Sequence, residues 1–144
     1  MATVITTGLP ETIAACDRFG VAMDAASRTI AAAFATMMEV EAKNNFEGTH
    51  ARGEPHVGGD KPNIVTGTLR GSITHSPVVG GFGIWSTTVG TDVVYGRRVE
   101  LGYPGGSGRG HAHTRPFPYL APAAKTVEAK LEAIALAEFL KALM

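Results

Sequence analysis

The amino-acid sequence predicts an α+β fold with a long N-terminal helix, a small antiparallel β-meander, a short helical turn and a C-terminal helix. Three features of the pattern predict it. Apolar residues at helical spacing fill the first third, short Gly-bounded alternating runs occupy the middle, and an Ala- and Leu-rich segment follows. The chain has 144 residues. This length favours a single domain over residues 1–144 with its own core, and long loops are expected at 46–63 and 103–114.

The N-terminal helix is predicted to run from Pro10 to about Asn45. Pro10 suits the first turn of a helix, Glu11 suits its positive end, and Gly48 follows its end. One apolar stripe recurs at alternating three- and four-residue steps and comprises Cys16, Phe19, Met23, Ala26, Ile30, Ala33 and Met37. Such a helix would be roughly 50 Å long. Because that length exceeds the core of so small a domain, part of it is expected to pack on a neighbouring subunit or against the sheet.

Residues 46–63 show no periodicity and are predicted to form a loop. A loop of this length is unusual inside a compact domain, so we expect it either to be disordered in the free protein or to become ordered on a partner. His50, His56, Glu54 and Asp60 lie in this loop. Their spacing is not that of a metal site, and no Cys accompanies them.

The meander is predicted in residues 71–95. Thr66 or Thr68 can cap a short turn before it, and residues 71–79 and 82–89 read as two strands. The Gly80-Gly81 dipeptide is a favoured hairpin turn. Residues 93–95 are expected to form a third short strand or its lead-in.

The stretch 95–122 is predicted to hold a deformable loop between two fixed ends. Residues 99–102 are expected to form a helical turn closed by Gly102, and Pro116 and Pro118 impose extended backbone before the last helix opens at Pro122. The apolar face of that helix comprises Val127, Leu131, Ile134, Leu136, Phe139, Leu140 and Leu143.

The charge balance argues against a nucleic-acid-binding module as the primary function. Thirteen Lys and Arg residues balance thirteen Asp and Glu residues, for a net charge of zero, so there is no overall field to attract DNA. Cys16 is the single cysteine, which excludes an intramolecular disulfide, and its apolar surroundings predict a buried small side chain. Neither a secretory signal nor a membrane span is expected.

The most suggestive polar cluster is Arg109, His111, His113 and Arg115. His111 and His113 could supply two zinc ligands, which would suit a small metal-dependent enzyme, but no third ligand stands nearby in the sequence. No catalytic residue, metal or cofactor is therefore predicted. The arginines are candidate contacts for DNA phosphates or for inter-subunit ion pairs. Glu100 is predicted to pair with one of them, either within its own turn or across an interface.

Three segments together resemble one phage family. Residues 66–73 (TGTLRGSI) are similar to its T-G-x-L-R-x-S-I signature, residues 94–102 (VYGRRVELG) to its V-x-Y-A-x-x-V-E-F-G-T block, and residues 115–123 (RPFPYLAPA) to its R-P-F-L-x-P-A approach to the last helix. This is the lambdoid-phage gene-ten family of tail components, which comprises neck and tail-completion proteins of long-tailed phages. The sequence departs from the pattern at Gly96, Leu101 and Tyr103, where the family has Ala, Phe and Thr.

The resemblance implies a structural, non-enzymatic protein of the virion, assembled in the host cytoplasm. Copies would form a ring, with six-fold symmetry to match a tail, at the head–tail junction around the DNA channel. The ring would contact head-completion or adaptor proteins and the tail terminator or tail tube, with non-specific contact to genomic DNA and none to membrane. A tail terminator capping the tail tube is the nearest alternative. The candidate interface residues are Arg70, Tyr95, Arg97, Arg98, Glu100, Arg109, His111, His113, Arg115, Phe139 and Leu143.

Overall fold

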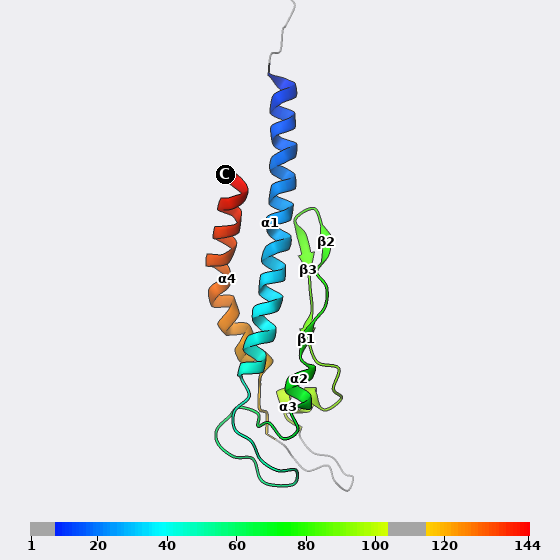
Figure 1. The fold of residues 1–144 in the computed structure, drawn as a ribbon, viewed down its shortest axis with the longest axis vertical. Helices are drawn as coiled ribbons and strands as arrows, with labels where there is room; N and C mark the ends of the chain where they lie inside the picture. The colour runs from blue at the N-terminus through cyan, green and yellow to red at the C-terminus, as the bar shows by residue number, and fades with distance from the viewer. Residues whose placement is uncertain (1–7, 104–114) are drawn as a thin grey trace, which may run out of the picture.

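In the computed structural model, which describes residues 8–103 and 115–144, one long helix forms the axis of an elongated molecule (Figure 1). Helix α1 spans Leu9–Asn44 and helix α4, Leu120–Leu143, runs antiparallel along one side of it. A β-hairpin lies along the other side, and helices α2 (Thr68–Ser72) and α3 (Gly96–Leu101) lie near the C-terminal end of α1. The predicted α+β class and order of elements are confirmed.

Helix α1 has 36 residues, which corresponds to about 54 Å. A proline in its first turn favours initiation, and Gly8 before it has a positive φ of 86°. Asn45 ends the helix, and its side-chain amide donates a hydrogen bond of 2.9 Å to the carbonyl oxygen of Tyr119. The end of α1 is therefore fixed to the start of α4.

The hairpin consists of two short antiparallel ladders separated by an irregular stretch. Strand β1 (Thr74–His75) pairs with β4 (Val89–Gly90), and β2 (Val79–Gly81) pairs with β3 (Ile84–Ser86). The strands are shorter than predicted because residues 76–78 and 87–88 leave the ladder. Hydrogen bonds involving Ser76 and Thr88 join the two arms across this break.

The predicted turn at Gly80-Gly81 is wrong, because both glycines belong to β2. The turn consists of Phe82 and Gly83, whose φ angles are 55° and 78°, as a two-residue turn of type I′ requires. Gly80 instead allows the backbone of β3 to approach β2 closely. A Cβ added there would lie 2.1 Å from the carbonyl oxygen of Ile84.

Of the two expectations for residues 93–95, a third strand or a lead-in, the strand is wrong. Thr91 Oγ1 accepts a hydrogen bond of 3.1 Å from the Val93 amide, and the Gly96 amide donates one of 2.8 Å to the Val93 carbonyl. These local bonds turn the chain into α3 rather than leaving it extended. Three consecutive apolar residues, Val93, Val94 and Tyr95, are too few to distinguish the two outcomes.

The main buried cluster lies at the C-terminal end of α1, where the four helices of the described residues meet. Tyr119, Ile73 and Val127 are its largest fully buried side chains. The cluster of buried residues comprises Met38, Ala42, Leu69, Ile73, Tyr119, Ala123 and Val127. The small residues among them allow α1 and α4 to approach closely.

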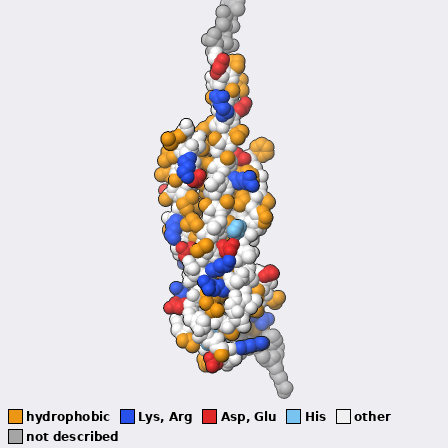
Figure 2. Space-filling model, in the orientation of Figure 1, with side chains coloured by type: hydrophobic (Ala, Val, Ile, Leu, Met, Phe, Trp, Pro, Cys, Tyr) orange, Lys and Arg blue, Asp and Glu red, His pale blue; other side chains and the backbone are white. Residues whose placement is uncertain are grey.

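The first third of α1 lies outside this core. Residues 9–20 are all exposed, including Leu9 and Ile13, which are 54% and 53% exposed. Cys16 is exposed as well, so its predicted burial is wrong. The N-terminal turns of α1 extend beyond both α4 and the hairpin (Figure 1). Figure 2 shows hydrophobic side chains on the visible surface at this end of the molecule as well as around its middle.

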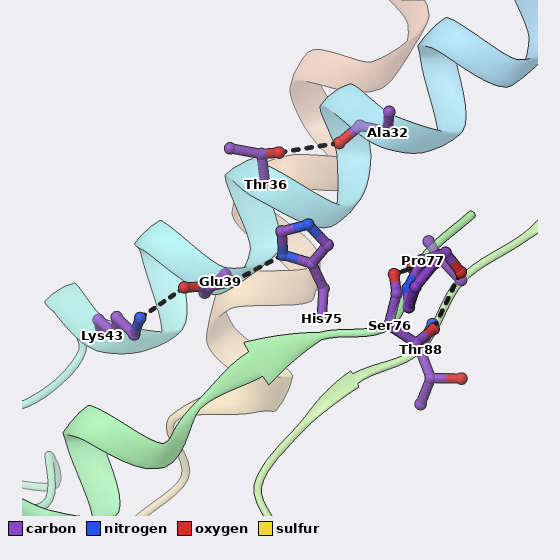
Figure 3. A network of polar contacts seen from close by, with 9 residues as sticks. Ala32, Thr36, Glu39, Lys43, His75, Ser76, Pro77 and Thr88 are labelled. Atoms are coloured by element: carbon purple, nitrogen blue, oxygen red, sulfur yellow. Dashed lines mark hydrogen bonds and ion pairs between the residues drawn. The ribbon is translucent and has the colours of Figure 1, made fainter.

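Polar contacts at two sites, Glu39 and Asp24 of α1, hold the hairpin against that helix. Near the core, His75 Nδ1 donates to Glu39 Oε2 at 2.6 Å, and Lys43 Nζ donates to Glu39 Oε1 at 2.5 Å (Figure 3). The bonds from Lys43 and His75 hold the pKa of Glu39 below its usual value. Near the turn, Asp24 Oδ1 accepts bonds from the Gly83 amide at 2.6 Å and from Trp85 Nε1 at 3.1 Å.

The loop 46–63 is ordered by its own chain, through the side chain of Asn63. Its amide group donates to the carbonyl oxygens of Val57 and Glu47 and accepts a bond of 2.8 Å from the Val57 amide. The Ile64 amide donates to the Gly48 carbonyl at 3.0 Å. These contacts join the two ends of the loop to each other and to its middle.

Candidate functional site

Glu100 joins α3 to the beginning of α4. Its carboxylate accepts three backbone hydrogen bonds, from Tyr119 at 2.7 Å, Leu120 at 2.9 Å and Ala121 at 2.9 Å. These amides have no partner inside the helix, and the helix N-terminus carries partial positive charge, so a carboxylate is well suited to bind them. The predicted ion pair within its own turn is therefore wrong: Glu100 caps a helix distant in sequence.

Arg115 connects the segment before α4 to the loop 46–63. Its guanidinium donates to the Gly59 carbonyl at 2.8 Å and to Asp60 Oδ1 at 3.4 Å, and lies 4.6 Å from the centre of the Phe117 ring. The Phe117 amide donates in turn to the Val99 carbonyl at 2.7 Å. The motif at residues 115–118 thus holds loop and helices together.

The other described arginines among the candidate interface residues differ in the contacts that they make. Arg70 donates from Nε to the Lys43 carbonyl at 3.0 Å, near the C-terminal end of α1, and Arg98 lies 4.7 Å from the Tyr103 ring centre. Arg97 is exposed and, among the described residues, forms no ion pair. Arg97 is thus accessible to another molecule.

The predicted cluster of Arg109, His111 and His113 lies outside the described residues. Within residues 8–103 and 115–144, no group of three or more His, Cys, Asp or Glu side chains is arranged to hold a metal ion. On α4, Phe139 is half-buried and Leu143 is 62% exposed. No helix in the described part of the chain has both the length and the hydrophobicity to cross a membrane.

An apolar cavity of about 310 Å³ opens at the core end of the molecule. Its wall includes the aromatic rings of Phe46, Tyr95 and Phe117 and the aliphatic side chains of Leu69 and Val99. His56 stacks on Phe117 with ring centres 4.0 Å apart, and its Nε2 donates to the Lys61 carbonyl at 2.9 Å. The lining residues come from four separate segments, so no local sequence pattern indicated the cavity, although Arg70 and Tyr95, which both line it, were among the predicted interface residues.

The second feature that the sequence did not reveal is Phe82 at the hairpin tip. It is the one non-glycine residue with positive φ in the described parts of the chain, and its side chain is 102% exposed. Ile84 and Val79, on the two strands beside it, are 79% and 60% exposed. The sequence signal for this turn is Phe82-Gly83, although the alternating pattern of residues 82–89 predicts a strand there.

Comparisons with protein-family models, with curated proteins and with solved structures find no match to this chain. The fold is that of an α+β protein in which α4 and a β-hairpin lie on opposite sides of α1, and the main cluster of buried residues lies at the C-terminal end of α1.

The ionisation of Tyr119 is expected to lower the stability of the fold at alkaline pH. Burial, and then the nearby negative charge of Glu100, raise the pKa of Tyr119 to about 12. In the unfolded chain the phenol ionises near pH 10, so the unfolded state loses a proton that the folded state retains. The free energy of unfolding should therefore fall by about 2–3 kcal/mol as the pH rises from 10 to 12.

Urea denaturation of the native chain and of Tyr119→Phe at each pH checks this expectation. The variant should lose the Tyr119 contribution, so its stability should fall less over this interval. Tyr95→Phe is the matched control, because Tyr95 is 45% exposed, and it should follow the native chain. Equal alkaline losses in the native chain and in Tyr119→Phe would contradict the assignment.

Proposed function

We propose that this chain is a structural protein of a phage virion that forms a ring at the head–tail junction around the DNA channel. The observation that carries the proposal is the apolar surface away from the core that no other described residue covers. Residues 9–20 of α1 are exposed throughout, and Leu136, Leu140 and Leu143 near the end of α4 are each more than half exposed. Apolar surface on this scale is typical of subunits that pack against neighbours.

The distribution of buried residues supports the same proposal. Of the nine buried hydrophobic residues among the described ones, four are alanines: Ala26, Ala35, Ala42 and Ala123. Alanine contributes little apolar area, so the hydrophobic stabilisation within one copy is modest for this chain length. Contacts between copies would add to the stability by mass action.

The resemblance of residues 66–73, 94–102 and 115–123 to the gene-ten family supplies the biological setting of the proposal. In this chain those segments contain Arg70, Glu100 and Arg115, whose side chains bind backbone groups of distant segments. These contacts give the three segments a common role in holding the core end of the subunit together. That role is compatible with a structural, non-enzymatic protein.

Immunogold electron microscopy of virions made by the genome that encodes the chain tests the proposal. We expect label at a single level, between head and tail, and co-purification of the chain with intact particles. Label along the whole tail, or absence of the chain from purified particles, would contradict the proposal.

Removal of the chain distinguishes a neck connector from a tail terminator. Loss of a connector should leave DNA-filled heads separate from tails of normal length. Loss of a terminator should leave tails of irregular and excessive length, because an uncapped tube continues to grow. We expect the first result.

A further inference from the structure

We propose that Phe82 of one copy inserts into the apolar cavity of a second copy, the cavity lined by Phe46, Tyr95, Phe117, Leu69 and Val99. This inference rests on the proposed ring and names one contact between adjacent subunits. The occupant is thus a segment of this same chain, the uncharged tip formed by residues 79–84.

The hairpin tip holds Phe82 in a fixed, outward position. A positive φ is unfavourable for a non-glycine residue, and such conformations persist where the surrounding structure imposes them and are concentrated at functional positions. Here the bonds from the Gly83 amide and Trp85 Nε1 to Asp24 hold the turn against α1. The aromatic ring is nevertheless fully exposed, so among the described residues nothing covers the side chain that this turn presents.

The cavity matches such a side chain in size and chemistry. A cavity of about 150 Å³ lined by apolar side chains is large enough to bind benzene, and this one has a volume of about 310 Å³. It therefore has room for the phenyl ring of Phe82 and for part of Ile84 beside it. Three aromatic rings in the wall offer the tilted or stacked contacts that aromatic side chains prefer.

The positions of the two surfaces determine the symmetry of the contact. The cavity lies near α2 and α3, at the C-terminal end of α1. The β2–β3 turn lies closer to the N-terminal end of α1 (Figure 1). A contact between two different surfaces is heterologous, and repetition of such a contact generates a ring when the rotation closes. Each copy would present one Phe82 and one cavity.

The small area of the contact predicts that two copies associate weakly and that a closed ring is more stable than a pair. An inserted aromatic side chain buries about 150–250 Å², whereas a stable interface buries about 800 Å² on each partner. Phe82 therefore acts as a central anchor that needs surrounding contacts. A closed ring, in which every copy makes two such contacts, should be more stable than an isolated pair.

Sedimentation velocity of the purified chain over a concentration series tests the inference. The native chain should form a concentration-dependent oligomer, and Phe82→Ser should weaken association by roughly ten- to a hundred-fold, because that is the affinity equivalent of burying one such side chain. Val65→Trp, at a 43% exposed residue in the cavity wall, should weaken it comparably by filling the opening. Val94→Ser is the matched control, because Val94 is 96% exposed and lies outside the tip and the cavity wall; it should associate like the native chain.

A mixture of the two weakened variants gives the sharper result. Phe82→Ser retains an open cavity and Val65→Trp retains Phe82, so equal amounts should form a one-to-one pair but no larger assembly. Far-ultraviolet circular dichroism verifies that each variant is folded. If Val65→Trp does not fold, disulfide cross-linking of Phe82→Cys with Thr66→Cys in a Cys16→Ser background replaces it, and cross-links between copies are expected.

Two outcomes overturn the inference and leave the proposed function standing. One is native-like association of Phe82→Ser, which would place the contact between copies elsewhere. The other is a native chain that stays monomeric at every concentration while immunogold still places it at the head–tail junction. Failure of the proposed function itself would appear separately, as absence of the chain from that junction.

Discussion

Replacement of Glu100 by alanine should lower the free energy of unfolding by about 3 kcal/mol, because three backbone amides of α4 lose a charged acceptor. The Glu100 carboxylate is also the contact that joins α3 to the beginning of α4, so the loss should not be confined to one helix end. Urea denaturation followed by far-ultraviolet circular dichroism measures the effect.

Glu128→Ala is the matched control for Glu100→Ala. Glu128 is an exposed glutamate on α4, so the same substitution there should change stability by less than about 0.5 kcal/mol. Glu100→Gln should lie between the two, because one carbonyl oxygen remains as an acceptor while the charge is lost. Equal stabilities of Glu100→Ala and Glu128→Ala would show that the cap contributes nothing.

Replacement of Gly96 by alanine should cost about 2 kcal/mol, although alanine is the better helix former. A Cβ at this position would lie 2.6 Å from Thr91 Cγ2, 3.1 Å from the Tyr119 hydroxyl and 3.2 Å from Leu69 Cδ1. The Thr91 side chain cannot rotate freely away from this Cβ, because its hydroxyl contacts Ser72 Oγ and accepts a hydrogen bond from the Val93 amide. Thermal unfolding at neutral pH provides the measurement.

Gly71→Ala provides the opposite expectation within the same protein. Gly71 is also helical, and a Cβ there would meet no atom within 4 Å, so the substitution should stabilise the chain by about 0.5–1 kcal/mol. Gly96 is also a position at which the resembled family has alanine. A stabilising Gly96→Ala would mean that Thr91 and Tyr119 shift at little cost.

The two long helices could be predicted from the sequence because each repeats its pattern over many turns. The stripe from Cys16 to Met37 covers 22 residues and the apolar face from Val127 to Leu143 covers 17, and helical periodicity is clear over such lengths. The hairpin was located correctly but its turn was misplaced, because Gly80-Gly81 matches a turn preference as well as Phe82-Gly83 does. The close approach of the Gly80 backbone to β3 requires a glycine within the strand, and this approach is visible only in the folded structure.

The functions of individual polar residues were harder to predict. Glu100 stands among arginines in the sequence, and proximity along the chain suggested an ion pair. Its carboxylate instead lies against amides nineteen to twenty-one positions away. The cavity was not predictable for a similar reason: Phe46, Tyr95 and Phe117 are far apart in sequence and meet only because α1, α3 and the segment before α4 converge.

The position of Trp85 has a consequence for spectroscopy. It is the single tryptophan of the chain, and it lies on the hairpin, bound to Asp24 and 5.5 Å from the Arg28 guanidinium, rather than in the core. Its fluorescence therefore reports the attachment of the hairpin to α1, whereas circular dichroism reports the helices. If the hairpin detaches before the helices unfold, the two signals will change at different urea concentrations, and the gap between the curves will measure how independently this arm of the molecule moves.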